Sequence, residues 1–176
     1  MTGAIAPSSQ FLARTMVEGL DLQSAGAVLE YGPGTGSFTG EILRQLRPSA
    51  KLVAIELNPE LADSFRTHHP NVTLVQDSVA NVERICSREG IRSVDCIVSG
   101  LPWASFSRAM QTEFLDAMMR VLKPGGRFVT FAYLHGLVLP PGKSFAALLP
   151  RYFKTVSKSG VVWLNLPPAV VYRCRK

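Results

Sequence analysis

Short apolar runs alternate with segments of helical period along most of the chain. The runs are rich in Val, Ile and Leu, which is typical of strands that are buried on both faces of a sheet. Strands that alternate with helices in this way indicate a parallel α/β sheet. The expected strands cover residues 26–29, 51–55, 72–75, 94–98 and 127–133.

Capping residues predict where two of the intervening helices begin. Ser37 is expected to cap a helix that runs to about Leu46. Asn58 is expected to cap the next helix, because Pro59 then takes the first helical position, where its missing N–H costs nothing. Each of these helices would follow directly on a strand, as a βαβ unit requires.

A longer helix is expected to begin at Ser107 and to end at Lys123–Pro124–Gly125–Gly126, where a glycine can take the left-handed conformation. Its apolar residues recur at spacings of three and four, so we expect this face to pack in the core. The stripe consists of Met110, Phe114, Met118, Val121 and Leu122.

Two late strands are predicted near 155–162 and 170–173, after a proline-rich turn at 140–142. Strands that follow such a break are expected to add an antiparallel hairpin to the edge of the sheet. The elements together predict an α/β fold with a seven-stranded, mostly parallel sheet and helices on both faces.

Composition is that of one globular domain, 1–176. The 176 residues are 47% hydrophobic and 18% charged, which excludes a disordered chain. The three cysteines (Cys86, Cys96 and Cys174) form neither a disulfide framework nor a metal-binding spacing, so we expect no metal and a reducing, cytoplasmic setting. No apolar stretch is long enough to span a bilayer, and the first residues lack the pattern of a signal peptide.

Charge is divided unevenly along the chain. Residues 1–116 carry 13 acids and 9 bases, whereas residues 117–176 carry 10 bases and no acid. Such asymmetry is typical of a surface that meets an anionic partner, either nucleic acid or phospholipid headgroups. An ordinary solvated face is the plainer interpretation.

The strongest local signal is the run Glu30–Tyr31–Gly32–Pro33–Gly34–Thr35–Gly36 between a strand and a helix. Glycines let the backbone turn tightly and approach a ligand closely, although a tight turn alone would also use them. Ser37 stands where the dinucleotide-binding fingerprint has its third glycine. Glu56 closes the next strand, 20 residues past Gly36, where a carboxylate can accept both ribose hydroxyls of a nucleoside.

Glu30, the acid before the glycine-rich loop, limits the class of ligand that the loop can bind. A carboxylate at Glu30 would repel a pyrophosphate and would suit a ligand with an ammonium group and no phosphate. This combination resembles motif I of the class I S-adenosylmethionine-dependent methyltransferases, which implies a Rossmann-like sheet and S-adenosyl-L-methionine as cofactor. Asp77 matches the acid that contacts the adenine amino group in these enzymes, and residues 122–127 resemble the turn before their fifth strand.

The resemblance implies a cofactor site at the carboxyl ends of the first four strands, with one contribution from the N-terminal segment. The residues expected to bind the cofactor are Ser9, Glu30, Tyr31, Gly32, Gly34, Gly36, Glu56, Leu57, Asp77, Ser78, Ser99 and Gly100.

The loop after the fourth strand bears on the acceptor. It reads Ser99–Gly100–Leu101–Pro102–Trp103, which is similar to the Asn-Leu-Pro-Tyr and Asn-Pro-Pro-Tyr runs of adenine-amino methyltransferases, including the rRNA dimethylases. In those enzymes the Asn helps to grip the target amine, whereas this chain has Gly100 at that position. A flipped adenine would lose that contact, which counts against a nucleobase acceptor.

The Ser-Gly-Leu-Pro form resembles the bacterial phospholipid N-methyltransferases. Residues 3–9 and 166–173 are similar to the N-terminal segment and the last strand of that family. The resemblance implies a peripheral enzyme of the cytoplasmic membrane surface that methylates phosphatidylethanolamine and its methylated forms. Family members often carry a basic amphipathic helix before the Pro-Ser-Ser segment. Only six residues precede Pro7 here, so we expect that anchor to be missing from this sequence.

Two aromatic residues are the candidate catalytic groups. Trp103 and Tyr133 could hold a methylammonium by cation–π attraction, although either could instead serve packing. No strong general base is evident, since a lone histidine such as His135 is more often structural. The pair His68–His69 is interpreted as a helix cap or surface pair rather than a metal site.

The basic C-terminal third offers a candidate docking face for an anionic phospholipid membrane. Arg151, Lys154 and Lys158 are interleaved with apolar residues, which is typical of a membrane-facing segment. Leu148, Leu149 and Phe153 could equally cover the sheet. Two other functions stay open: methylation of rRNA or another nucleic acid at adenine N6, and a cofactor-binding module without turnover.

Overall fold

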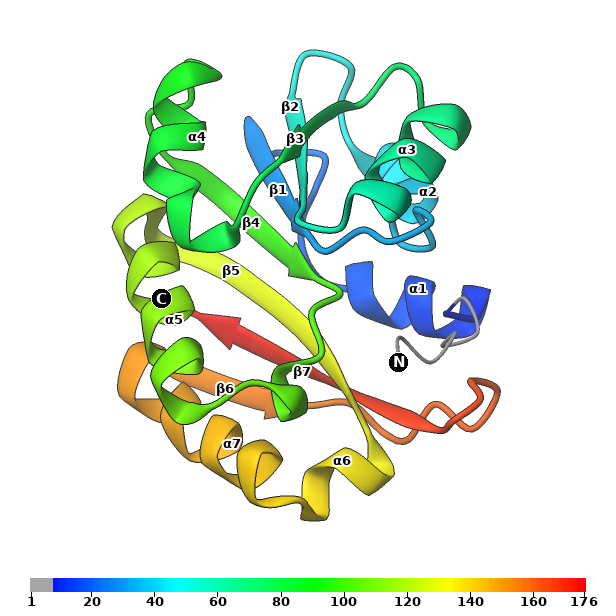
Figure 1. The fold of residues 1–176 in the computed structure, drawn as a ribbon, viewed down its shortest axis with the longest axis vertical. Coiled ribbons are helices and arrows are strands. Elements are labelled where there is room, and N and C mark those ends of the chain that lie inside the picture. The colour runs from blue at the N-terminus through cyan, green and yellow to red at the C-terminus, as the bar shows by residue number, and fades with distance from the viewer. Residues whose placement is uncertain (1–7) are drawn as a thin grey trace.

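The fold is a seven-stranded mixed sheet covered by helices on both faces, in a computed structural model that describes residues 8–176 (Figure 1). The strand order is β3-β2-β1-β4-β5-β7-β6. The first five strands are parallel, and β7 runs antiparallel to both β5 and β6. The strands are β1 (Ala27–Tyr31), β2 (Lys51–Glu56), β3 (Thr73–Gln76), β4 (Val94–Ser99), β5 (Leu122–Tyr133), β6 (Thr155–Lys158) and β7 (Ala169–Arg175). The predicted seven-stranded sheet with an antiparallel C-terminal edge is confirmed.

The helices divide the core between the two faces of the sheet. One apolar cluster lies under α4, α5 and α7, and the other lies under α1 and α2 (Figure 1). The helices are α1 (Gln10–Val17), α2 (Thr39–Gln45), α3 (Pro59–His68), α4 (Val82–Arg88), α5 (Arg108–Val121), α6 (Leu134–Val138) and α7 (Pro140–Tyr152), with short 3-10 turns at Val79–Asn81 and Trp103–Ser105.

Most of the predicted caps are present. The Asn58 side chain accepts hydrogen bonds from the N–H groups of Glu60 and Leu61, and Pro59 stands at the start of α3. The Ser107 side chain accepts one from Met110 N–H at the start of α5. The predicted cap at Ser37 is wrong. The helix begins two residues later, after Phe38, whose buried ring fixes the start of α2 by packing in the core instead.

Three details of the C-terminal half differ from the sequence prediction. Met110 is 39% exposed, so it lies outside the buried stripe of α5. Leu122 starts β5 rather than ending the helix, and Gly125 within that strand has the expected left-handed φ of 75°. The proline-rich segment at 140–142 opens α7 instead of forming a loop, because proline suits a first helical turn.

Of the two predicted late strands, the first is shorter than predicted, and the second, β7 (Ala169–Arg175), extends beyond the predicted 170–173 at both ends. β6 ends at Lys158, and beyond it only an isolated bridge joins Val162 to Ala169. Leu148, Leu149 and Phe153 are buried, so these residues of α7 and its end cover the sheet. The apolar part of the candidate membrane segment is therefore core, which leaves only its basic residues on the surface.

Candidate active site

The glycine-rich run forms a tight cradle between β1 and α2. Gly32, Gly34 and Gly36 all have positive φ, at 60°, 57° and 89°. Gly32 N–H donates to the carbonyl of Ile55 at 2.9 Å, and Gly34 N–H donates to Glu56 Oε2 at 3.2 Å. The cradle is thus held against the carboxyl end of β2, at the edge where ligands of parallel sheets bind.

The loop after β4 is locked into this cradle. Gly100 N–H donates to the carbonyl of Tyr31 at 2.7 Å. A β-carbon added to Gly100 would lie 2.5 Å from the carbonyl oxygen of Gly32, and one added to Gly32 would lie 2.7 Å from a methyl of Leu101. Real β-carbons do not approach other atoms so closely. Gly100 therefore requires glycine, because the clash is with backbone. Gly32 favours glycine because its φ of 60° strains any other residue and a β-carbon would displace the Leu101 side chain.

Glu30 is fully buried beneath the cradle. Its Oε2 accepts a hydrogen bond from the Thr39 hydroxyl at 2.7 Å, whereas its Oε1 has no hydrogen-bond partner. Burial raises the pKa of this carboxyl from 4.5 to about 7, with the Thr39 hydrogen bond opposing part of that rise. A buried carboxylate with a free oxygen is suited to a cationic ligand group.

Glu56, the last residue of β2, is hydrogen-bonded to the glycine cradle and to the turn before α3. Besides Gly34 N–H, its carboxylate accepts Asn58 N–H on Oε1 at 3.0 Å. Each carboxylate oxygen has a second lone-pair site, so the group can still accept hydroxyl donors. Leu57 follows with its side chain 67% exposed, so it is free to pack on a bound ligand.

Asp77 and Ser78 stand at the end of β3 beside Glu56. Asp77 N–H donates to the Glu56 carbonyl at 3.2 Å. The Asp77 carboxylate accepts from Asn81, from Ser78 N–H and from Arg84, and its pKa is lowered, above all by the Asn81 hydrogen bond. Ser78 accepts from Ala80 N–H and caps the next turn. Both predicted residues therefore lie at the same edge as the cradle.

The side chain of Tyr31 does not face the cradle. Its side chain points into the core on the face opposite Glu30, where it is fully buried and its hydroxyl has no partner. Successive residues of a strand point to opposite faces, so only one of this pair can face the cradle side. Tyr31 reaches the site through its carbonyl alone.

Trp103 differs from its prediction. It is 2% exposed and stacks on Phe145 with ring centres 4.5 Å apart, while its indole N–H donates to the buried Ser99 hydroxyl at 3.1 Å. The ring is enclosed by core residues and offers no face to an acceptor. It instead anchors the loop after β4, together with Ser99.

Tyr133 lies at the carboxyl end of β5 and is half-buried. Its ring stacks on His135 with centres 5.6 Å apart and meets the edge of Phe131. Burial raises the pKa of its hydroxyl, which keeps that hydroxyl neutral. Of the two predicted catalytic aromatics, only Tyr133 is placed where a ligand could reach it.

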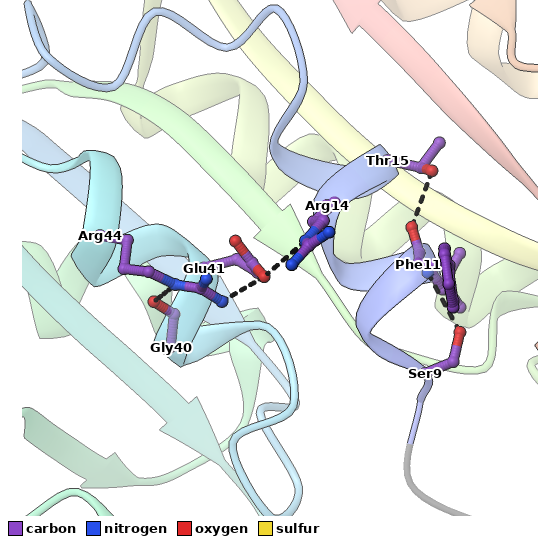
Figure 2. A network of polar contacts seen from close by, with 8 residues as sticks. Ser9, Phe11, Arg14, Thr15, Gly40, Glu41 and Arg44 are labelled. Carbon is purple, nitrogen blue, oxygen red and sulfur yellow. Dashed lines mark hydrogen bonds and ion pairs between the residues drawn. The ribbon is translucent and has the colours of Figure 1, made fainter.

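The N-terminal helix is fastened beside the cradle. Ser9 caps α1 by accepting Leu12 N–H, and its own N–H donates to the side chain of Asn165 at 2.9 Å. Arg14 of α1 and Arg44 of α2 both pair with the buried carboxylate of Glu41 (Figure 2). This links α1 to the helix that follows the cradle. The resembling residues 3–7 lie outside the described part of the chain.

Two residues near the site, Gln111 and Asn165, were missed by the sequence analysis, and a third, His69, was predicted only as a helix cap or surface residue. His69 ends α3, as a cap should, but its ring fills the space where a β-carbon of Gly36 would stand. Gln111 is buried, and its amide donates to the carbonyls of Trp103, Phe106 and Pro141, which ties the loop after β4 to α7. Asn165 is buried in the loop before β7. The contacts of His69 with Gly36, of Gln111 with Pro141 and of Asn165 with Ser9 join segments far apart in sequence, so no local pattern could reveal them.

The predicted basic residues lie away from this edge. Thr155 and Arg127 both pair with Arg175, so the start of β6 is level with Arg127, six residues before the carboxyl end of β5 at Tyr133. Arg151 and Lys154 precede that point in the chain, and Lys158 is level with Thr130. The open grooves along α5 and between α4 and α5 also lie away from the cradle. Within residues 8–176, no helix has the length and apolar character to cross a bilayer. No three His, Cys, Asp or Glu side chains of this part of the chain gather as a metal site would require.

Known proteins share this arrangement. The "Methyltransferase domain" family matches residues 28–126. An ornithine lipid N-methyltransferase of Singulisphaera acidiphila is 30% identical over 98% of this chain and 87% of its own length. A ubiquinone/menaquinone biosynthesis C-methyltransferase of an Enterobacter strain is 26% identical, over 81% of this chain and 58% of its own.

Solved structures show the same fold. An O-methyltransferase from Bacillus cereus in complex with SAH gives a TM-score of 0.69 at 15% identity, over 100% of this chain and 84% of that one. TrmN from Thermus thermophilus gives 0.70 at 17% identity, over 94% of this chain and 48% of that one.

The chain therefore belongs to the class I S-adenosylmethionine-dependent methyltransferases. Within that class it is similar to the lipid N-methyltransferases, and S-adenosyl-L-methionine is its cofactor. The residues present fit this cofactor. The unpartnered, buried Oε1 of Glu30 suits its ammonium group, and the glycine cradle leaves the backbone open to a close approach.

Proposed function

We propose that this protein methylates the amine headgroup of phosphatidylethanolamine and its methylated forms at the membrane surface. The observation that carries the proposal is the similarity to an ornithine lipid N-methyltransferase over almost the whole chain. That relative's name states an amine nitrogen on a lipid as the acceptor. Phosphatidylethanolamine offers the same chemistry, a primary amine on an amphiphile, and so does an ornithine lipid.

The glycine at residue 100 supports a lipid over a nucleobase. The place of Gly100 against Gly32 leaves no room for any β-carbon, so an asparagine could not be accommodated without moving the loop. A site without that amide lacks the group that would orient a flipped adenine. An aliphatic amine is a stronger nucleophile with free rotation, so it depends less on such a contact.

Each part of the site has a proposed role in this reaction. When bound, the cofactor supplies a methyl group on a positively charged sulfur, which an unprotonated amine attacks in line. Glu30 would hold the cofactor's ammonium group, and Glu56 would accept its ribose hydroxyls. Asp77 and Ser78 would border the adenine, with Leu57 packed against it. The backbone of Ser99 and Gly100 would border the reacting end, and Ser9 would close the site from the N-terminal side.

Tyr133 is the proposed contact for the acceptor. Its ring can attract the methylammonium groups that form as methylation proceeds, because an aromatic face carries partial negative charge. It lies at the carboxyl end of β5, the same edge as the loop after β4. The enzyme is proposed to act as a cytoplasmic protein bound peripherally to the membrane.

Methyl transfer from labelled S-adenosylmethionine tests the proposal. Vesicles with phosphatidylethanolamine, vesicles with an ornithine lipid and bulk RNA should be offered in parallel, with phosphatidylcholine vesicles as the control without a methylatable amine. We expect label in phosphatidylethanolamine, and the number of labelled products would count the methyl groups added. Label in the ornithine lipid alone would show that the acceptor is an ornithine lipid rather than phosphatidylethanolamine, and that the protein is still a lipid N-methyltransferase.

Two outcomes would contradict the lipid proposal. Label in RNA would assign the protein to nucleic-acid methylation despite Gly100. Cofactor binding without transfer to any acceptor would favour a binding module that does not turn over. The variant Gly34→Val distinguishes an enzyme from a docking module: a side chain at this left-handed position should abolish the transfer by an enzyme, whereas the docking of a non-catalytic module would stay intact.

A further inference from the structure

The loop between β6 and β7 exposes large apolar side chains. Trp163 is 70% exposed, Leu164 66% and Leu166 82%. Three such residues within four positions form more than the scattered exposure that a protein surface normally carries. Their exposure needs a partner that covers them.

The loop is a built structure rather than a loose excursion. Asn165 lies between the exposed residues but is itself buried, 2% exposed. Its side chain accepts Ser9 N–H and donates to the carbonyl of Pro167 at 2.7 Å. Val162 and Ala169 bridge the two ends of the loop. The fold therefore fixes this turn and directs its apolar side chains outward.

Two neighbouring segments extend the apolar surface. α6 adjoins the loop, since Leu134 N–H donates to the carbonyl of Pro168 at 3.0 Å, and it ends in the exposed residues Val138 and Leu139. α1 adjoins it through the Ser9–Asn165 hydrogen bond and exposes Phe11. We call this set the apolar rim: Phe11, Val138, Leu139, Trp163, Leu164 and Leu166.

The rim lies at the edge of the sheet that carries the active site. Ala169, directly after the loop, pairs with Tyr133 at the carboxyl end of β5, and Leu134 of α6 follows Tyr133 in the chain. Figure 1 shows α6, the β6–β7 loop and the start of α1 around this same end of the sheet. The basic residues Arg151 and Lys154 precede Thr155, which is level with Arg127, six residues before Tyr133 in β5.

We propose that the apolar rim inserts into the interfacial layer of a phospholipid bilayer and so holds the active-site edge against it. Tryptophan prefers the headgroup level, where its ring is buried and its N–H stays wet, and the leucines can reach the first acyl carbons. The whole chain carries a formal net charge of +6. That net charge is attracted by anionic lipid and repelled by a second copy of the chain, which favours the bilayer as occupant.

This inference rests on the proposed function, because a lipid acceptor is the reason for docking. The docking itself can occur without methyl transfer. A rim beside Tyr133 would let a lipid amine enter the site while its acyl chains stay in the bilayer. It also reassigns the docking face. Arg151, Lys154 and Lys158 then contribute only long-range attraction, which salt screens.

Vesicles of phosphatidylcholine and phosphatidylglycerol test the docking without any acceptor amine. The chain has two tryptophans, and Trp103 is buried, so a change in emission reports Trp163. We expect a blue shift with vesicles and quenching by lipids brominated near the headgroup. Trp163→Phe should abolish both signals while vesicle binding persists.

A pair of matched variants separates insertion from charge. W163S/L164S/L166S should weaken vesicle binding on the order of 100-fold at low and at high salt, because burial of apolar surface is not screened. R151Q/K154Q/K158Q should weaken it at low salt only. Unchanged thermal unfolding and cofactor affinity in the rim variant would show that its fold is intact, since these side chains are exposed.

Two results would overturn the docking proposal. One is vesicle binding that survives the rim variant but is lost in the basic variant at both salts. The other is a dimer of the native protein, seen by sedimentation, that the rim variant dissociates without loss of vesicle binding.

The proposed function has a separate readout. A short-chain phosphatidylethanolamine below its micelle concentration needs no docking, so the native protein and the rim variant should methylate it equally. If the native protein docks on vesicles but does not methylate this soluble lipid, the proposed function is contradicted and the docking proposal is not. If the native protein and the rim variant methylate lipid in vesicles equally, the docking proposal is contradicted and the proposed function is not.

Discussion

The α-carbon of Gly100 lies so close to Gly32 that a β-carbon on residue 100 would stand 2.5 Å from the Gly32 carbonyl oxygen. This contact joins the loop after β4 to the glycine cradle, at the point where cofactor and acceptor must meet. Gly100 cannot be replaced without moving a backbone segment of the site, and a side chain at Gly32 would have to displace the side chain of Leu101.

Gly100→Ala should therefore disrupt cofactor binding and transfer. We expect a loss of about 1–3 kcal/mol in the free energy of unfolding, because the clash is with backbone that cannot rotate away. The matched control is Gly40→Ala in α2, where a β-carbon would meet nothing within 4 Å and stability should be unchanged or rise by up to about 1 kcal/mol. Chemical denaturation and calorimetry of cofactor binding measure both. Equal behaviour of the two variants would contradict the close contact.

Glu30 should make cofactor binding depend on pH. Its pKa is raised to about 7 by burial, so the carboxyl ionises only near neutrality in the free protein. The ionised form attracts an ammonium group, and we expect affinity to rise with pH through about 7. Glu30→Gln keeps the shape but cannot ionise, so it should remove this part of the pH dependence. Calorimetry of both proteins at several pH values isolates Glu30 from any titration of the cofactor.

The same carboxyl should make the free protein less stable as pH rises. Between pH 4.5 and about 7 the unfolded chain has released this proton while the folded chain retains it, so the free energy of unfolding falls with pH in that window. The contribution is on the order of 3 kcal/mol at full ionisation. Glu30→Gln should be the more stable protein above pH 7 and similar to the native protein near pH 4.5. Thermal melts of both proteins across this pH range measure the effect. A difference in melting temperature that does not change with pH would contradict the prediction.

Glu56→Ala should weaken cofactor binding by roughly 10- to 100-fold. The change removes the acceptor proposed for the ribose hydroxyls and also frees Gly34 N–H and Asn58 N–H, and charge-assisted hydrogen bonds are worth about 1.5–3 kcal/mol each. Glu60→Ala, an exposed acid of α3, is the matched control and should bind normally. Unchanged affinity of Glu56→Ala by calorimetry would exclude the ribose role.

His69 and Gly36 should be energetically coupled. A β-carbon at Gly36 would overlap the His69 ring, so Gly36→Ala suffers both from this overlap and from its left-handed backbone at φ 89°. Removal of the ring in His69→Ala relieves only the overlap. The double variant should therefore lose less stability than the sum of the single variants. A strictly additive double-mutant cycle would show that the ring moves aside freely.

Sequence and structure contributed differently to the candidate site. The glycine run, Glu30, Glu56 and Asp77 were predictable because each stands at a fixed offset from a strand end, and strand ends of a parallel sheet converge. Tyr31 and Trp103 were not, because the direction of a side chain depends on which face of the strand it occupies and on what packs there. The basic residues 151, 154 and 158 were assigned to a docking face from their spacing alone. The strand pairing instead puts Arg151 and Lys154 before the level of Arg127 in β5, and Lys158 level with Thr130.

The sequence by itself determined the succession of the seven strands, the helices α2, α3 and α5, the caps at Asn58 and Ser107, and the chemistry of the cradle, since these depend on local patterns and on the spacing of residue types. Only the tertiary structure decided the rest. The interlock of Gly100 with Gly32, the enclosure of Trp103 and the fixing of the β6–β7 loop by Ser9 and Asn165 all join residues that are remote in the chain. Such contacts arise from the packing of whole layers, and that packing selects which side chains a site can present.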